Sequence, residues 1–524
     1  MIEKEVVLKP EEAFNEEVVL STIKNKLQLK DSQYFRIAKR SIDARSKEVK
    51  VRVKVEINND TPLADRINYK ISDLPKVHEA KQTAIIIGAG PAGLFAALRF
   101  IELGWKPVIL ERGKDVRSRR RDLADINKKH IVNSESNYCF GEGGAGTYSD
   151  GKLYTRSKKR GDIYRILEIL VAHGAKEDIM IDAHPHIGTN KLPKIIQSIR
   201  DSIIEHGGEV HFNTKVTSFQ VENNELKGVK ANDKNYIADA YILATGHSAR
   251  DIFHLLHESN ILIEAKPFAL GVRVEHPQRI IDQIQYKCDD RGEYLPASSY
   301  ALVHQTYFND KKRGVFSFCM CPGGFIVPAA TESGEIVVNG MSPSRRDSKY
   351  ANSGIVVAIE LEDMLQFDDK GPFKGLALQE SIEQQACKIA GNTQAAPAQR
   401  LIDFTQGKLS KDLPDTSYQP GLVSTRMDEV LPPFIAERLK TAFKAFGKKM
   451  KGYFTNEAII VGVESRTSSP IRIPREKESL EHTQTKRLFP CGEGAGYAGG
   501  IVSAAMDGER CAERAVELYK IKNE

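Results

Sequence analysis

The chain has 524 residues, of which 41% are hydrophobic and 28% charged, and its formal net charge is +6. This length allows two or three domains with large cores, and the composition is that of a soluble globular protein. So small a net charge does not by itself indicate nucleic acid. The seven cysteines are scattered and odd in number, the N-terminus lacks a signal peptide's apolar core, and no apolar stretch reads as a membrane span. We therefore expect a cytoplasmic protein.

Residues 1–57 predict a small independent module. Their hydrophobic patterns indicate a strand, a helix and two paired strands, in this order: Glu5–Leu8, Glu11–Leu27, Tyr34–Lys39 and Val49–Ile57. This is a βαββ unit of ferredoxin-like type. Residues 58–82 are polar and contain two prolines, so they predict a linker.

The most informative segment follows the linker. Apolar residues 84–87 lead into Gly88-x-Gly90-x-x-Gly93, a helical pattern follows, and the next apolar strand ends at Glu111. The glycines permit a tight turn, close approach of a pyrophosphate and close packing of helix on strand, while the acid suits a ribose hydroxyl. This strand–turn–helix–strand unit predicts dinucleotide binding.

Two later segments favour FAD as the dinucleotide. The strand over residues 241–243 ends in Ala244-Thr245-Gly246, a pattern typical of two-dinucleotide-fold flavoproteins. Near the C-terminus, a strand runs into Gly492-Glu493 and a helix begins at Gly500 and Ile501, whose N–H groups can face the flavin. We expect non-covalent FAD. The residues predicted to bind it are Gly88, Gly90, Pro91, Ala92, Gly93, Glu111, Arg112, Gly113, Arg119, Gly144, Gly146, Thr147, Val216, Ala244, Thr245, Gly246, Gly492, Glu493, Gly500 and Ile501.

Six further motifs carry a family resemblance. They occupy residues 143–153, 184–189, 244–251, 271–277, 319–324 and 464–470. With these motifs the chain resembles the uncharacterised bacterial FAD-dependent dehydrogenases and, more distantly, the aminoacetone-oxidase-like flavoproteins. The resemblance covers essentially the whole chain and implies the fold and the cofactor, but it defines no substrate, electron acceptor or oligomeric state.

The predicted architecture is an α/β two-dinucleotide-binding-type FAD fold with an α+β substrate domain and the N-terminal ferredoxin-like module. Residues 83–260 and 455–524 would form the FAD-binding domain, and residues 261–454 the substrate domain. No second glycine-rich βα motif opens a nicotinamide domain, although transient binding of NAD(P)H stays open. The glycine-rich run 141–146 is interpreted as a loop against the cofactor, with a surface loop as the alternative.

Candidate chemical groups are few. Arg466, near Ser468, could clamp a substrate carboxylate, or it could pair with an acid such as Glu464. Cys319 and Cys321 could be a redox dithiol or a nucleophile, but their apolar strand pattern favours a structural role. We expect no metal site, because no second cysteine pair completes a ligand set. The histidines 184, 186 and 247 are read as structural.

Basic residues cluster in three places. One of the arginines 117, 119, 120 and 121 could reach the FAD phosphates. The clusters 156–160 and Arg36–Lys47 suggest either an RNA surface or a solvated face, and their interspersed acids favour the latter.

The sequence thus predicts an FAD-dependent oxidoreductase that moves two electrons through flavin N5 to or from a small molecule, with oxygen, a nicotinamide or another carrier completing the cycle. An FAD-dependent RNA-modifying enzyme and a flavin-containing scaffold or sensor without turnover are the alternatives.

Overall fold

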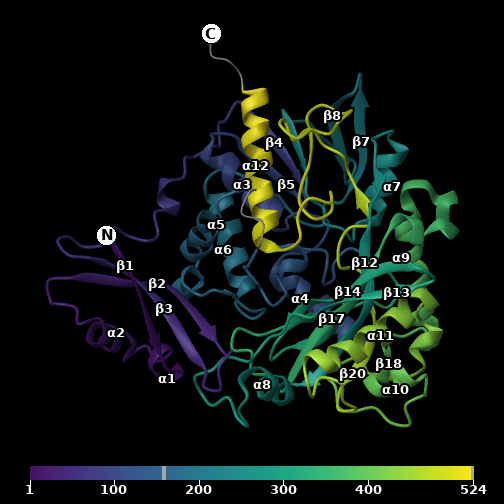
Figure 1. Ribbon diagram of the computed structural model, residues 1–524. Helices are drawn as coiled ribbons and strands as arrows, with labels where there is room; N and C mark the ends of the chain where they lie inside the picture. The colour runs from purple at the N-terminus through teal and green to yellow at the C-terminus, as the bar shows by residue number, and fades with distance from the viewer. Residues whose placement is uncertain (156–160, 521–524) are drawn as a thin grey trace.

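The computed structural model describes residues 1–155 and 161–520, so most of the basic cluster 156–160 lies outside the described residues. Figure 1 shows three parts: the N-terminal module at the lower left, the dinucleotide-binding domain above, and the substrate domain at the lower right. The C-terminal helix lies beside the first helix of the dinucleotide-binding domain, so the FAD-binding fold is assembled from distant parts of the chain.

The N-terminal module has the ferredoxin-like arrangement that the sequence predicts. Its strands pair antiparallel in the order β1-β3-β2, with the third strand between the first two. The elements are β1 (Ile2–Leu8), α1 (Pro10–Ala13), α2 (Val19–Leu27), β2 (Tyr34–Asp43) and β3 (Lys50–Asn58). The helix expected over Glu11–Leu27 is divided, because the Asn15 side chain accepts the Glu17 N–H at 3.0 Å and forms a local turn there.

The module is attached to both larger domains. The β2 residue Arg40 exchanges backbone hydrogen bonds with Ile181 and Ala183, at 2.8 and 2.9 Å, and its guanidinium pairs with Asp182 at 2.9 Å. Lys287, from the substrate domain, donates to the Arg45 carbonyl at 2.8 Å. A linker with one 3-10 turn, η1 (Ile71–Asp73), leads to the next domain.

The dinucleotide-binding domain is built on a parallel sheet, as predicted. Its strand order is β22 (Leu488–Pro490), β10 (Ala240–Leu243), β4 (Thr83–Ile87), β5 (Lys106–Leu110) and β6 (Glu209–His211). The other elements are α3 (Pro91–Glu102), α4 (Val116–Lys129), η2 (Gly144–Gly146), α5 (Ile163–Ala172), η3 (Glu177–Met180), α6 (Leu192–Glu205), β7 (Val216–Glu222), β8 (Glu225–Ala231), β9 (Lys234–Tyr236), α7 (Arg250–Glu258) and α12 (Ile501–Tyr519).

Both faces of this sheet are buried, which explains its continuous apolar strands. Ile86 faces a core shared with α3, α5, α6 and α12, whereas Ile85 and Ile87 face a second core shared with β7, β8 and α7. The carboxyl ends of β4, β5, β10 and β22 meet at one edge, where open α/β sheets place their ligands.

The substrate domain contains a seven-stranded mixed sheet. Its strand order is β13 (Val303–Phe308), β14 (Lys311–Cys321), β17 (Tyr350–Ile359), β12 (Phe268–Pro277), β20 (Ile459–Glu464), β18 (Ala396–Arg400) and β19 (Leu422–Ser424). The remaining elements are α8 (Gln278–Tyr286), β15 (Phe325–Pro328), β16 (Val338–Met341), η4 (Leu361–Asp363), η5 (Leu365–Phe373), α9 (Lys374–Ile389), α10 (Leu401–Gln406), η6 (Met427–Glu429) and α11 (Pro433–Lys449). A separate two-stranded sheet pairs β11 (Glu264–Ala265) with β21 (Ile471–Arg472), and Ile471 packs in the core of the dinucleotide-binding domain.

One boundary differs from the expectation. Strand β20, which the sequence assigned to the FAD-binding domain with residues 455–524, lies inside the substrate-domain sheet between β12 and β18. Its apolar run has the same composition as a strand of either sheet, so only pairing over long sequence distances decides its place.

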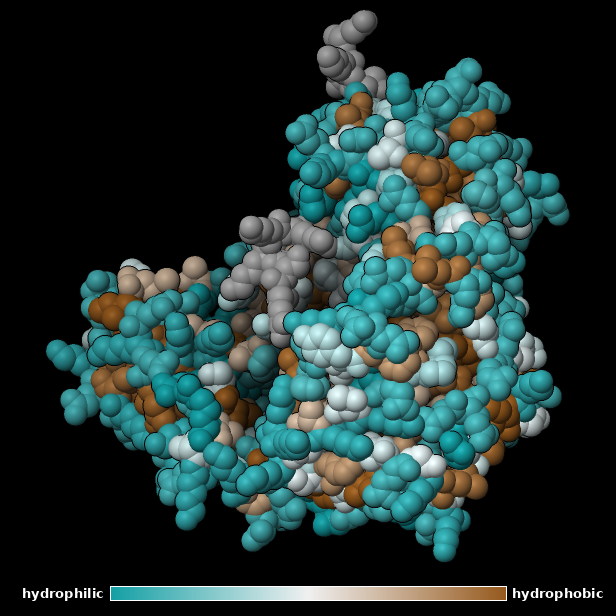
Figure 2. Space-filling model, turned by 45° about the vertical axis from the view of Figure 1, so that its right-hand side comes forward, coloured by the Kyte–Doolittle hydropathy of each residue, from teal (hydrophilic) through white to brown (hydrophobic). Residues whose placement is uncertain are grey.

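The face of the molecule in Figure 2 is mostly hydrophilic, with apolar residues in small groups. In the described part of the chain, no helix has both the length and the hydrophobicity needed to cross a bilayer.

Candidate active site

The turn between β4 and α3 has the geometry that its glycines predict. Gly88 has a φ of +106°, and a Cβ on it would lie 2.5 Å from the Ala244 carbonyl oxygen. A Cβ on Gly93 would lie 2.0 Å from the Gly88 oxygen, so this residue serves helix packing. A Cβ on Gly90 would meet nothing within 4 Å. The fold itself thus requires glycine at positions 88 and 93, whereas Gly90 faces open space that a ligand can fill.

Glu111 joins three backbone segments at the tip of β5. Its carboxylate accepts the N–H groups of Ala89, Gly113 and Gly141 at 2.8, 2.8 and 3.0 Å. A carboxylate has about four acceptor positions, so one is left for a ribose hydroxyl. Glu111 therefore holds three backbone segments in place and also lines the cavity at this edge of the sheet.

The glycine-rich run 141–146 lies against the β4–α3 turn rather than at a free surface. Gly143 donates its N–H to the Ala89 carbonyl at 2.8 Å. Arg119 is fully buried and donates to the carbonyls of Asn137 and Glu142 at 2.7 and 2.9 Å, and to that of Gly144. We correct one prediction here: Arg119 holds this loop from behind and does not line the cavity, so it is not placed to contact a phosphate.

Segments later in the chain complete the same edge. A Cβ on Gly246, Gly499 or Gly500 would meet nothing within 4 Å, and α12 begins there at Ile501. The N–H groups of a first helical turn have no intrahelical acceptor and favour negative charge. Burial raises the pKa of Glu493 to about 7, with Lys266 opposing the shift, so the site favours the protonated form of this carboxyl more than water does.

These segments enclose a cavity of about 310 Å³. Of the predicted residues, those that line it are Gly88, Gly90, Pro91, Ala92, Glu111, Arg112, Gly144, Gly146, Val216, Ala244, Thr245, Gly246, Arg466, Gly492, Glu493, Gly500 and Ile501. Gly93, Gly113, Arg119, Thr147 and Ser468 lie outside its lining. Thr147 donates its hydroxyl to the Glu142 carbonyl at 2.7 Å, so it closes the glycine-rich loop instead.

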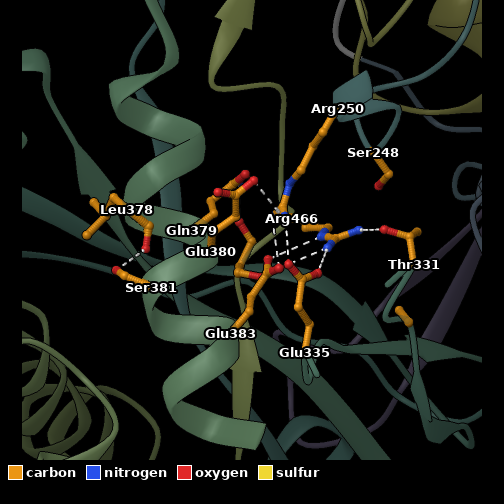
Figure 3. A network of polar contacts seen from close by, with 12 residues as sticks. Ser248, Arg250, Thr331, Glu335, Leu378, Gln379, Glu380, Ser381, Glu383 and Arg466 are labelled. Atoms are coloured by element: carbon orange, nitrogen blue, oxygen red, sulfur yellow. Dashed lines mark hydrogen bonds and ion pairs between the residues drawn. The ribbon is translucent and has the colours of Figure 1, made fainter. Parts of the chain in front are cut away.

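Arg466 belongs to a buried charge network that joins the two large domains (Figure 3). Its Nη2 lies 2.9 Å from Glu335 and 2.8 Å from Glu383, and its Nη1 donates to Thr331 at 2.6 Å. Arg250 pairs with the same two glutamates, at 2.8 Å each. Burial acts to raise the pKa of Glu383, but the charges of Arg250 and Arg466 outweigh it and lower that pKa.

This network contradicts the carboxylate clamp. All three nitrogens of the Arg466 guanidinium already donate, so no free pair of N–H groups faces a ligand. The ion-pair alternative describes the geometry, but the partners are Glu335 and Glu383, whereas Glu464 pairs with Arg273 at 2.7 Å.

The cavity extends to the substrate domain, where Phe318, Cys319, Asn339 and Gly340 form its wall. Cys319 has a φ of +44°, in the left-handed region, at a bulge in the pairing of β14 with β17. Its neighbours Met320 and Cys321 are buried, but Cys319 is exposed. Cys321 is thus buried within the strand pattern, whereas Cys319 is accessible, and the structural role of the pair stays a prediction.

Comparisons with known proteins match most of the chain to FAD-dependent proteins. Residues 267–467 match the model of the FAD-dependent protein C-terminal domain, residues 186–339 match that of the FAD dependent oxidoreductase, and residues 1–58 match a domain of unknown function. An uncharacterised protein of Clostridium beijerinckii is 40% identical over 500 residues, which cover 93% of this chain and 92% of the relative. The chain belongs to a family of FAD-dependent oxidoreductases.

Two solved enzyme structures resemble this chain at low sequence identity. The flavin-dependent brominase Bmp2 has 13% identity and a TM-score of 0.37, with 84% of this chain and 80% of that chain covered. Glycine oxidase from Bacillus cereus has 12% identity and a TM-score of 0.32, with 84% and 96% covered.

The cavity fits FAD by its own features. The open space at Gly90 lies where α3 begins, which suits a diphosphate. Glu111 retains an acceptor position that suits the adenosine ribose, and Glu493 lines the same cavity as Gly500 and Ile501 at the start of α12. Arg112 lines the cavity as expected, but its guanidinium is engaged by Glu135 and Asp251, each at 2.8 Å.

Sequence reasoning missed two groups on the substrate side of this FAD site. Asp150 and Lys152 belong to a motif that carries the family resemblance, yet the sequence assigned them no role. Both line the cavity, as does His247, whose pKa is lowered to about 4 by burial and by Arg466 and Arg250. The available signal was position, because Asp150 and Lys152 closely follow the glycine-rich run 141–146, which lies against the β4–α3 turn.

Proposed function

We propose that this FAD-dependent oxidoreductase oxidises or reduces a small molecule by two-electron transfer, with hydride passing between the substrate and flavin N5. One observation carries the proposal: a single cavity extends from Gly90 and Glu111, in the FAD-binding segments, to Cys319 and Asn339 in the substrate domain. A molecule held against the substrate-domain wall would therefore meet the cofactor inside the protein, away from bulk water.

The residues of the chain have distinct tasks in this proposal. The start of α3 binds the diphosphate through backbone N–H groups, and Glu111 accepts from the adenosine ribose. The start of α12 stabilises negative charge that develops on the ring system when it is reduced. Bound FAD supplies the hydride chemistry, while the protein orients the substrate and excludes water.

The second half-reaction would use oxygen, a nicotinamide or another carrier. A nicotinamide nucleotide would have to bind transiently, because the described residues contain one glycine-rich dinucleotide turn of the Gly88–Gly93 kind. We place the enzyme in the cytoplasm, on the odd and scattered cysteines.

The test begins with the cofactor. Purified protein should be yellow, and denaturation should release FAD rather than FMN, because Glu111 is suited to an adenosine ribose that FMN lacks. Anaerobic titration should then reduce the bound FAD with two electrons. Absence of FAD even after reconstitution would overturn the proposal. Copurified RNA with a steep salt dependence would favour the RNA-modifying alternative, and bound FAD that no reductant or substrate reduces would favour the scaffold.

A further inference from the structure

Lys152 places an ammonium group on the substrate side of the cavity with donors to spare. It donates one hydrogen bond, to the Met320 carbonyl of β14. The carboxylate beside it belongs to Asp150, whose Oδ2 lies 3.6 Å from Nζ, beyond hydrogen-bond distance. An ammonium group has three N–H donors, so two lack an acceptor among the described residues.

The charge of Lys152 is not neutralised by its neighbourhood. The Asp150 carboxylate is engaged by Arg346, at 2.6 and 3.2 Å. Each other arginine or lysine that lines the cavity contacts two carboxylates: Arg112, Lys215 and Arg466. Two cations, Lys152 and Arg346, therefore share the single carboxylate of Asp150, which leaves one positive charge on this wall without a carboxylate of its own.

Cys319 reaches the same part of the cavity. Its left-handed backbone at the β14 bulge turns it away from its buried neighbours, and it is accessible from the cavity although protein surrounds that cavity. Burial raises the pKa of Cys319 to about 11, with Lys152 opposing the shift, so at neutral pH it is an uncharged thiol. The thiol adds a weak donor to this wall without cancelling the ammonium charge.

We infer that Lys152 and Cys319 bind a singly charged group of the substrate, a carboxylate. One uncompensated positive charge matches one negative charge, and the free N–H groups of the ammonium match carboxylate oxygens. The inference rests on the proposed function, because it assigns the substrate class of that same cavity: a small organic acid. The FAD diphosphate is expected elsewhere, at the start of α3, whereas Lys152 is hydrogen-bonded to a strand of the substrate domain.

The first experiment uses Cys319 as a reporter. FAD-loaded protein is treated with iodoacetate or with iodoacetamide, which is similar in size but uncharged, and alkylation of the Cys319 peptide is followed by mass spectrometry. In either case the sulfur displaces iodide and the thiol proton goes to solvent. Both reagents react with the same thiolate, so a change in the thiol pKa alters both rates equally and does not affect their ratio. The ratio therefore measures how strongly the site attracts the negatively charged iodoacetate.

Lys152→Met should lower the ratio of iodoacetate to iodoacetamide rates at Cys319 at least fivefold, whereas Lys152→Arg should largely keep it. Cys288, on a different part of the substrate domain, is the internal control and should show the same ratio in all variants. An unchanged ratio at Cys319 in Lys152→Met would overturn the inference.

The second experiment uses benzoate and its neutral counterpart benzamide. Benzoate should perturb the visible spectrum of bound FAD, and Lys152→Met should weaken this binding at least tenfold, with benzamide binding little affected. If Lys152→Met instead loses its FAD, the ammonium is a cofactor contact and the inference falls while the proposed function stands. If the wild-type protein binds no FAD, the proposed function fails, and the alkylation ratio measured on the FAD-free protein still decides the anion site.

Discussion

Gly508 of α12 lies directly against Ala92 of α3: a Cβ added to Gly508 would be 2.1 Å from the Ala92 carbonyl oxygen. The two helices that begin at the FAD cavity, one from each end of the fold, can approach this closely only because residue 508 has no side chain. The contact fixes both helix N-termini relative to each other, and therefore fixes the two ends of the cofactor site.

Gly508→Ala should destabilise the protein although alanine is the better helix former. The methyl group would collide with backbone that cannot move independently, and such overpacking costs about 1–3 kcal/mol, which exceeds the roughly 1 kcal/mol gained in helix propensity. Urea unfolding of the variant measures the effect. Gly90→Ala is the matched control, since a Cβ there meets nothing within 4 Å, and equal stability of the two variants would refute the packing argument.

Gly90→Val should abolish FAD binding while leaving the fold intact. The backbone of Gly90, with φ −75° and ψ −177°, is open to any residue, and the space beside it holds no protein atom within 4 Å. A side chain there would occupy the expected place of the pyrophosphate. Far-UV circular dichroism and FAD content measured on the same sample separate the two effects. Normal FAD content in this variant would mean that the diphosphate lies elsewhere.

The stability of the FAD-free protein should depend on Glu493. Its pKa is raised from 4.5 to about 7 in the folded chain, so the fold favours the protonated form. Its stabilising contribution is complete below pH 4.5 and is lost as the pH rises to about 7. Relative to Glu493→Gln, the wild type should lose on the order of 1–3 kcal/mol of unfolding free energy across this interval.

Denaturant titrations at pH 4.5, 6 and 7.5 check this dependence. The exposed Glu517, replaced by glutamine, is the control, and its pH profile should match that of the wild type. Parallel profiles for the wild type and Glu493→Gln would contradict the assigned shift.

Removing one partner of the Arg466 network should destabilise the junction between the two large domains. Glu383 is fully buried and holds both Arg250 and Arg466, so Glu383→Ala would leave two buried guanidinium groups with fewer partners. Breaking such a pair costs about 3–5 kcal/mol. Differential scanning calorimetry measures the loss, with Gln384→Ala, an exposed position on the same helix, as the comparison. Arg466→Ala should show a similar loss of stability, and a purely kinetic defect at full stability would restore the substrate-clamp interpretation.

The sequence by itself determined the parts of this protein whose constraints are local. Gly88, Gly90, Gly93 and Glu111 lie within one strand–turn–helix–strand unit, so their spacing prescribes both the turn and the edge of the sheet where the dinucleotide binds. The Gly492-Glu493 motif likewise directly follows the strand whose end it indicates, β22. The αβ class, the ferredoxin-like module and the FAD requirement all follow from patterns of this kind, because hydrophobic period and glycine position act over a few residues.

Only the tertiary structure decided which charges meet. Arg466 finds its partners in Glu335 and Glu383 rather than in the adjacent Glu464, and Arg119 turns to carbonyl groups of the glycine-rich loop rather than to a phosphate. Lys152 and Cys319 come together because a loop of one domain lies against a bulged strand of the other. Such contacts depend on strand pairing, loop packing and domain packing between residues that are 18 to 168 positions apart in the chain. The sequence shows which side chains are charged, but it does not show which of them this packing brings together.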